Sequence, residues 1–129
     1  VVWGTGTPRR EFVFADDLAD AALFVMKSYE GPGPINLGGG ADLSIAELAH
    51  AIAAVVGYRG RILFDPTRPD GMPMKRLDAE RLRAMGWQPT TPLPIALEQT
   101  YRWHLRNGAA ERCASLHGTR NASNHAMGG

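Results

Sequence analysis

The sequence contains a single cysteine, Cys113, among 129 residues. One cysteine cannot form a disulfide within the chain, and this favours a reducing, cytoplasmic location. Cys113 has no cysteine or histidine neighbours at the spacing of a zinc site, so we expect no bound metal.

Long apolar runs and an excess of one charge are also missing. No stretch approaches the roughly 20 consecutive apolar residues that cross a bilayer, and the first residues show no signal-peptide pattern. A formal net charge of +1 gives no dominant basic field for collecting phosphates. We therefore expect neither a membrane nor a nucleic acid as partner.

The residues that are present suit one small folded domain. Apolar residues make up 44% and charged residues 21% of the chain, as in ordinary globular proteins. Apolar spacing and turn residues predict an α/β (α+β-like) domain of short strands with three to four helices. The expected strands are 12–14, 35–37 and 61–64, and the expected helices are 17–29, 45–56, 79–85 and one that starts at 92–94.

Local signals fix several of these ends. Ser44 and Glu47 form the pattern of a capping box, and Gly57 suits the residue after a helix end. Asp17 is expected to cap the first helix. Periodicity is lost after Asn107, so we expect a folded domain over 1–107 and a disordered tail over 108–129.

Two segments carry candidate binding residues. The first, residues 3–10, places Trp3 and two arginines around Gly4-Thr-Gly6, which we interpret as a turn because a strand, not a helix, follows it. A guanidinium binds phosphate through paired hydrogen bonds, which suits a diphosphate, and a solvated surface charge is the alternative for each arginine. Arg9 is expected to be such a surface charge, whereas a binding role for Arg10 rests on the family resemblance that follows.

The second segment is the stiff loop 68–75. Two prolines and Gly71 constrain it, so Asp70 and Lys75 could offer a hydroxyl acceptor and a phosphate partner. A plain surface loop and, for Trp3, simple core packing are the alternatives that the residues alone leave open.

These segments and the order of elements between them resemble the C-terminal part of the GDP-L-fucose synthase family. That family belongs to the extended short-chain dehydrogenases/reductases, in the NAD-dependent epimerase/dehydratase group. The resemblance covers roughly residues 1–107. The matching runs are 2–12 (VWGTGTPRREF), 16–21 (DDLADA), 35–38 (INLG), 44–48 (SIAEL), 64–65 (FD), 68–71 (RPDG), Lys75, 77–78 (LD), 82–87 (LRAMGW) and 100–103 (TYRW).

The resemblance implies a substrate-binding domain that lacks the family's N-terminal Rossmann domain. Trp3, Arg10, Asp70 and Lys75 match substrate-contacting positions of the family, with Arg10 and Lys75 against the diphosphate of a GDP-sugar. It also implies NADP(H) as cofactor of the full-length enzyme, bound by the missing domain, and a homodimer. The family's reaction converts GDP-4-keto-6-deoxy-D-mannose to GDP-L-fucose.

The same comparison predicts that this chain has no catalytic residues and is inactive alone. The family's reductase needs a Tyr-x-x-x-Lys pair. The sequence lacks this pair, because the residues four positions after its three tyrosines are Gly33, Ile62 and Leu105. Two alternatives remain open, a non-catalytic nucleotide-sugar binding module and a fragment of another NAD-dependent nucleotide-sugar epimerase or dehydratase.

Overall fold

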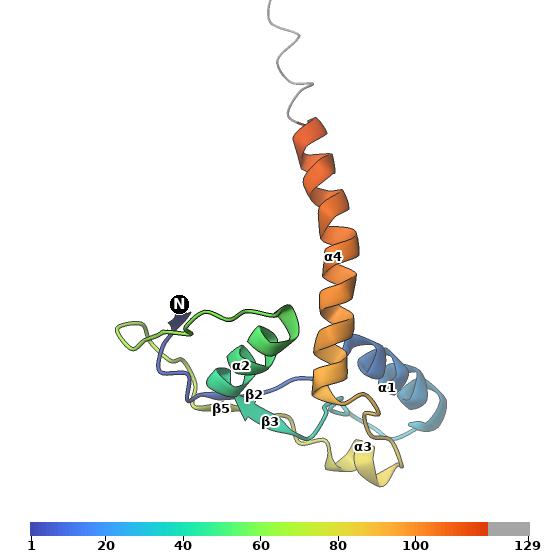
Figure 1. Cartoon of the computed structure of the whole chain (residues 1–129). Helices are drawn as coiled ribbons and strands as arrows, with labels where there is room; N and C mark the ends of the chain where they lie inside the picture. The colour runs from blue at the N-terminus through green and yellow to red at the C-terminus, as the bar shows by residue number, and fades with distance from the viewer. Residues whose placement is uncertain (119–129) are drawn as a thin grey trace, which may run out of the picture.

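The computed structural model describes residues 1–118, with side chains as far as 108, and combines short strands with four helices in this part of the chain (Figure 1). This confirms the predicted α/β class. The helices are α1 (Ala15–Ser28), α2 (Ile45–Val56), α3 (Glu80–Ala84) and α4 (Leu93–Gly118). The strands are β1 (Val2–Trp3), β2 (Arg9–Glu11), β3 (Asp42–Ser44), β4 (Phe64–Asp65) and β5 (Met74–Lys75).

The strands form two small sheets from segments that are distant in sequence. β1 pairs in parallel with β4, and Val2 lies opposite Phe64. In the second sheet β2 is central, antiparallel to β3 on one side and parallel to β5 on the other. This arrangement carries the loop between β4 and β5 back to the N-terminal segment.

The predicted positions of the strands are wrong. In place of the strand expected at 12–14, the structure has β2, which ends just before it. Of the strand expected at 61–64, only residue 64 belongs to a strand, and it forms β4 together with Asp65. Residues 35–37 form no strand; Ile35 and Leu37 pack against the core, but no strand pairs with them in the described chain. The β-propensity of a residue reflects how well its side chain fits a half-buried, pleated surface. A strand also needs a neighbouring strand to hydrogen-bond with its backbone, and propensity does not show where that neighbour is.

Helix α2 begins and ends where its local signals predict. Ser44 Oγ accepts the Glu47 N–H at 3.1 Å, and Glu47 Oε2 accepts the Ser44 N–H at 2.7 Å, which completes the capping box. These hydrogen bonds with Ser44 lower the pKa of Glu47. Gly57 ends the helix with φ of 70°, a left-handed conformation in which glycine carries no Cβ penalty.

Asp17 does not cap α1, contrary to the prediction. The helix begins one turn earlier, with Phe14 as its N-cap, so the Asp17 carboxylate lies inside the first turn. It is 6% exposed and reaches the segment before α4, where it accepts the Thr91 N–H at 3.1 Å and the hydroxyls of Thr90 and Thr91. Burial alone would raise the pKa of Asp17, but these hydrogen bonds outweigh it and the pKa is lowered.

The core is small and lies where α1 and α3 meet the segment that follows α3. Its buried members are Ala21, Leu82 and Trp87, and among the large side chains described, as far as residue 108, only Leu82 is almost fully buried. The Trp87 indole N–H donates to Asp20 Oδ2 at 2.8 Å. Many large apolar side chains remain exposed, including Trp103 and Leu105 on α4.

Helix α4 is longer than the sequence predicts. It packs against α2 near its start and continues to Gly118, well past the expected boundary at Gly108, so that its far end projects from the rest of the molecule (Figure 1). Alanine, glutamate and arginine over 109–114 favour a helix even though the apolar periodicity is lost. The remainder of the predicted tail, 119–129, lies outside the described residues.

Candidate functional site

The pairing of β2 with β5 brings Arg10 and Lys75 together. The two residues are in direct register on parallel strands, so their side chains share one face of the sheet. Both line a hollow of about 260 Å³ whose other walls come from residues near Leu37 and Leu77. Two cations from the two segments predicted to bind ligand thus lie at one site.

The neighbouring arginine has a different role. The Arg9 guanidinium pairs with the Asp42 carboxylate, donates to the Asp42 carbonyl at 2.9 Å and approaches Glu47 at 3.6 Å. It therefore joins β2 to β3 and the start of α2, which corrects the prediction of a solvated surface charge. Adjacent positions on a strand face opposite ways, so Arg9 and Arg10 serve opposite faces.

Arg10 and Lys75 have no carboxylate partner in the part of the chain that the structure describes. Arg10 Nη1 donates to the Arg9 carbonyl at 2.7 Å, which orients the guanidinium and leaves its other N–H groups for a ligand. Gly71 lies next to it, since a Cβ there would be 3.7 Å from Arg10 Nη2. The loop 68–75 therefore borders the site at two points.

Trp3 is not a core residue. Its side chain is 70% exposed, and the Arg68 guanidinium lies over the ring at 5.1 Å from the centroid. This cation–π contact holds the ring beside the loop. Trp3 does not line the hollow at Arg10, so the structure does not bring it together with Arg10 and Lys75.

Asp70 fastens the loop to the Gly4-Thr-Gly6 turn. Its Oδ1 accepts the Thr5 N–H at 2.6 Å and its Oδ2 accepts the Thr5 hydroxyl at 2.7 Å. Gly4 and Gly6 have φ of 85° and 79°, and a Cβ on Gly4 would lie 2.2 Å from Asp70 Oδ1. The segment is thus the turn that was predicted, and Asp70 uses both oxygens on the chain itself.

Glu11 is the residue of this site that sequence reasoning did not single out. Its carboxylate accepts the Gly40 N–H at 2.6 Å and the Leu77 N–H at 2.8 Å, and it lines the same hollow as Arg10. Its only sequence signal is an acidic residue beside Arg10 on a strand, and that pattern does not reveal partners so far along the chain.

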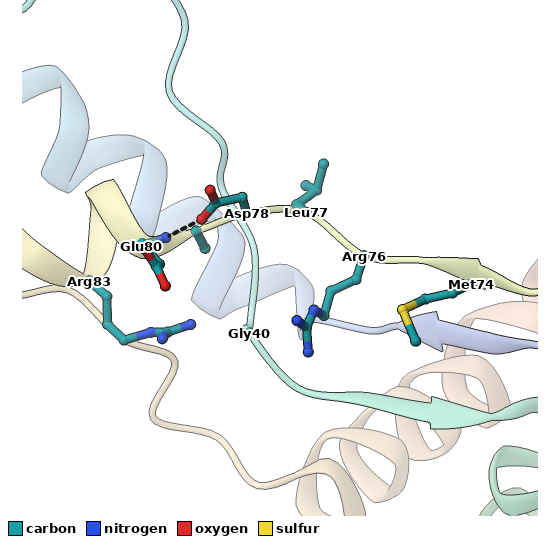
Figure 2. Close-up of a pocket in the computed structure, with 8 residues that line it drawn as sticks. Gly40, Met74, Arg76, Leu77, Asp78, Glu80 and Arg83 are labelled. Carbon is teal, nitrogen blue, oxygen red and sulfur yellow. Dashed lines mark hydrogen bonds between the residues drawn. The ribbon is translucent and has the colours of Figure 1, made fainter.

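A larger cavity of about 620 Å³ shares Arg76 and Leu77 with this hollow and is otherwise lined mainly by Gly40 and residues of the 78–83 segment. Figure 2 shows Arg76 and Arg83 directed toward Gly40 from two sides, with Asp78 and Glu80 on the adjoining chain. Two cations and two carboxylates give this cavity no net charge, and Arg76 is already 3.4 Å from Asp42. The chemistry of an anion site therefore favours the smaller hollow.

Several kinds of site are not found in the described residues. No group of three or more His, Cys, Asp and Glu side chains there could hold a metal ion. None of the helices there combines the length and apolar character needed to cross a membrane. The Gly4-Thr-Gly6 turn leads into β2, so it does not offer the helix N-terminus that a dinucleotide fingerprint requires.

The chain is similar in sequence and in fold to parts of known proteins. Residues 1–38 match the model of the NAD dependent epimerase/dehydratase family. A GDP-L-fucose synthetase from Naegleria fowleri, solved with NADP bound, superposes with a TM-score of 0.77 at 31% identity over 84% of this chain and 35% of that one. A GDP-6-OMe-4-keto-L-xylo-heptose reductase from C. jejuni gives a TM-score of 0.73 at 32% identity over 82% of this chain and 33% of that one.

By these matches the chain is similar to members of the NAD-dependent epimerase/dehydratase family. Within that family, it is similar to the GDP-L-fucose synthases. The probable GDP-L-fucose synthase 1 of Oryza sativa subsp. japonica is 46% identical over 107 residues, which are 83% of this chain and 33% of the relative. The chain thus spans about a third of the length of the curated relatives it matches, and the resemblance drawn from the sequence is confirmed.

Proposed function

We propose that this chain is the substrate-binding part of a GDP-L-fucose synthase. Such an enzyme is an NADP-dependent epimerase and reductase that converts GDP-4-keto-6-deoxy-D-mannose to GDP-L-fucose. The observation that carries the proposal is the direct register of Arg10 and Lys75 in a stretch of sequence similar to that family. These residues would hold the diphosphate of the GDP-sugar.

The physical chemistry of the site fits a diphosphate. A guanidinium can bind phosphate oxygens through two parallel hydrogen bonds, and an ammonium adds a compact charge. Trp3 offers an exposed ring for the base or sugar, and it is held by Arg68 beside the loop. Asp70 would act mainly by keeping that loop closed on the turn, because Thr5 uses both its oxygens.

The residues of this chain do not fit NADP(H). Residues 1–118 contain no glycine-rich strand–turn–helix unit, and the sequence has no Tyr-x-x-x-Lys pair. We therefore propose that other parts of a full-length enzyme bind the cofactor and carry out the chemical step. We propose that the chain alone binds the nucleotide-sugar and catalyses neither step. Cytoplasmic location and assembly as a homodimer remain predictions.

A titration of the 129-residue chain with GDP, UDP and dTDP tests the binding role. GDP is expected to bind tightest, and Lys75→Ala is expected to weaken it by about tenfold, because one charge-assisted contact is lost. Equal affinity for the three nucleotides would remove the GDP assignment. Turnover of the keto-sugar with NADPH by the chain alone would contradict the proposed absence of catalysis.

The relatives also favour one alternative for the sugar. The similar structure from C. jejuni is a reductase of a GDP-linked heptose, so the same scaffold occurs with a different sugar. Competition between GDP-fucose and GDP-mannoheptose for the chain distinguishes the two. Tighter binding of the heptose would replace the fucose assignment while leaving the GDP assignment intact.

A further inference from the structure

Glu11 connects three segments around the hollow that holds Arg10. Its Oε1 accepts the Gly40 N–H at 2.6 Å, and its Oε2 accepts the Leu77 N–H at 2.8 Å. Gly38 lies against the same carboxylate, since a Cβ there would be 2.7 Å from Oε1. One side chain on β2 therefore fixes both the 38–40 loop and the segment after β5.

The contact with Leu77 extends the pairing of β2 with β5. The backbone register ends at Arg10 and Lys75, and the Arg9 N–H donates to the Pro73 carbonyl at 2.8 Å on the near side. On the far side, the Glu11 carboxylate holds the Leu77 N–H in place of a further strand bond. Lys75 is thus held from both directions along the chain.

The charge of Glu11 is not used in an ion pair. Arg10, Lys75 and Arg76 all line its hollow, yet the described chain contains no salt bridge to Glu11, whose two oxygens accept backbone N–H groups. A carboxylate in that place repels a bound diphosphate by its charge while it orders the cations that attract it. The repulsion weakens diphosphate binding and the ordering strengthens it, so a substitution of Glu11 can distinguish the two effects.

We propose that Glu11 is a positioning residue that sets the separation of Arg10 and Lys75 for a nucleoside diphosphate. This inference rests on the proposed function. If Glu11 acted on the ligand only through its charge, Glu11→Gln would strengthen GDP binding, because a negative charge leaves the site. As a positioning residue, it gives the opposite result, because the amide nitrogen of glutamine cannot accept an N–H.

The experiment compares the affinities for GDP and guanosine in the full chain, Glu11→Gln and Glu11→Asp. Both variants are expected to weaken GDP binding by about tenfold, since one charge-assisted hydrogen bond to the backbone is lost in each. Aspartate keeps the charge but is one methylene too short to reach both N–H groups. Guanosine affinity is expected to stay unchanged, because guanosine has no diphosphate.

Glu98→Gln is the matched control, since it removes the same charge from an ion pair with Arg102 on α4. Unchanged or tighter GDP binding by Glu11→Gln would overturn the proposal. An equal loss for GDP and guanosine would also overturn it, because general loosening of the fold does not distinguish the two ligands.

Amide hydrogen exchange gives a readout that needs no ligand. Exchange at Gly40 and Leu77 is expected to quicken in Glu11→Gln and to stay unchanged in Glu98→Gln. Failure of the unsubstituted chain to bind GDP would count against the proposed function. The exchange rates would then still decide the positioning role, and unchanged rates would overturn it.

Discussion

Glu11 and Asp17 hold distant parts of the chain in the same physical way but in different surroundings. Glu11 accepts N–H groups from Gly40 and Leu77 at the edge of the β3-β2-β5 sheet. Asp17 accepts the N–H of Thr91, together with the hydroxyls of Thr90 and Thr91, where α1 meets the segment before α4. Each carboxylate thus supplies acceptors that the backbone of another segment lacks.

The surroundings decide what each contact does for the protein. Asp17 is 6% exposed, and threonine groups supply all of its hydrogen bonds, so its contribution is to stability. Glu11 lies beside Arg10 and Lys75, which have no carboxylate partner in the described chain, so we propose that its contribution is to the geometry of a binding site. The comparison teaches that the same hydrogen-bond pattern has to be judged together with the charges around it.

Asp17→Ala is expected to have the largest effect on stability. The substitution leaves the half-buried Thr91 N–H and the hydroxyls of Thr90 and Thr91 without their charged acceptor, and this costs about 3 kcal/mol in the free energy of unfolding. Urea unfolding followed by circular dichroism measures the loss. The adjacent and exposed Asp16 provides the control, because Asp16→Ala is expected to change stability by less than about 1 kcal/mol.

Arg10→Ala and Arg9→Ala test whether neighbouring residues of β2 contribute separately to GDP binding and to stability. Arg10→Ala is expected to weaken GDP binding by about thirtyfold, or about 2 kcal/mol, because a charge-assisted phosphate contact is lost. Arg9→Ala is expected to lower stability instead, because the Asp42 side chain is left with only the weaker Arg76 pair. Calorimetric titration and urea unfolding of both variants give the two quantities. An equal loss of GDP affinity in the two variants would contradict the assignment of binding to Arg10 and of stability to Arg9.

A smaller effect is the pH dependence of the stability difference between the unsubstituted chain and Asp17→Asn, which isolates Asp17 from Glu47, the other carboxyl group whose pKa is lowered. The pKa of Asp17 is lowered in the folded chain, so its contribution is present above the unfolded pKa of about 3.9 and is lost as the pH falls through the folded value. Asp17→Asn keeps the shape without the titration. The stability difference between the two proteins is expected to shrink from pH 6 toward pH 3 in urea unfolding. A difference that does not change with pH would contradict the lowered pKa.

The sequence predicts those parts of the fold whose partners are local. Ser44 and Glu47 are three residues apart, and their capping box and the glycine that ends α2 lie where expected. The turn at Gly4-Thr-Gly6 is likewise a local property of its residues. The strands were misplaced because each depends on a neighbour that local propensity does not specify.

The candidate site shows the same difference between what local sequence predicts and what depends on distant partners. Residue type and resemblance predict Arg10, Lys75, Trp3 and Asp70 as binding residues, and the structure pairs the first two in register. Sequence reasoning missed what holds them, because Glu11 and Leu77 are 66 positions apart and Asp17 and Thr91 are 74 apart. A carboxylate that accepts backbone N–H groups leaves no pattern in its partners, since every residue except proline carries that donor.

Ser44→Ala has the smallest expected effect and sharpens the contrast between local and distant contacts. It removes the hydroxyl that accepts the Glu47 N–H, but the helix end stays close to water, which can replace the acceptor. The cost is expected to be about 1 kcal/mol, well below that of Asp17→Ala, and GDP affinity is expected to stay unchanged. Urea unfolding and a GDP titration of the same sample measure both. A loss as large as that of Asp17→Ala would show that local capping, and not the junction between α1 and α4, governs the stability of this chain.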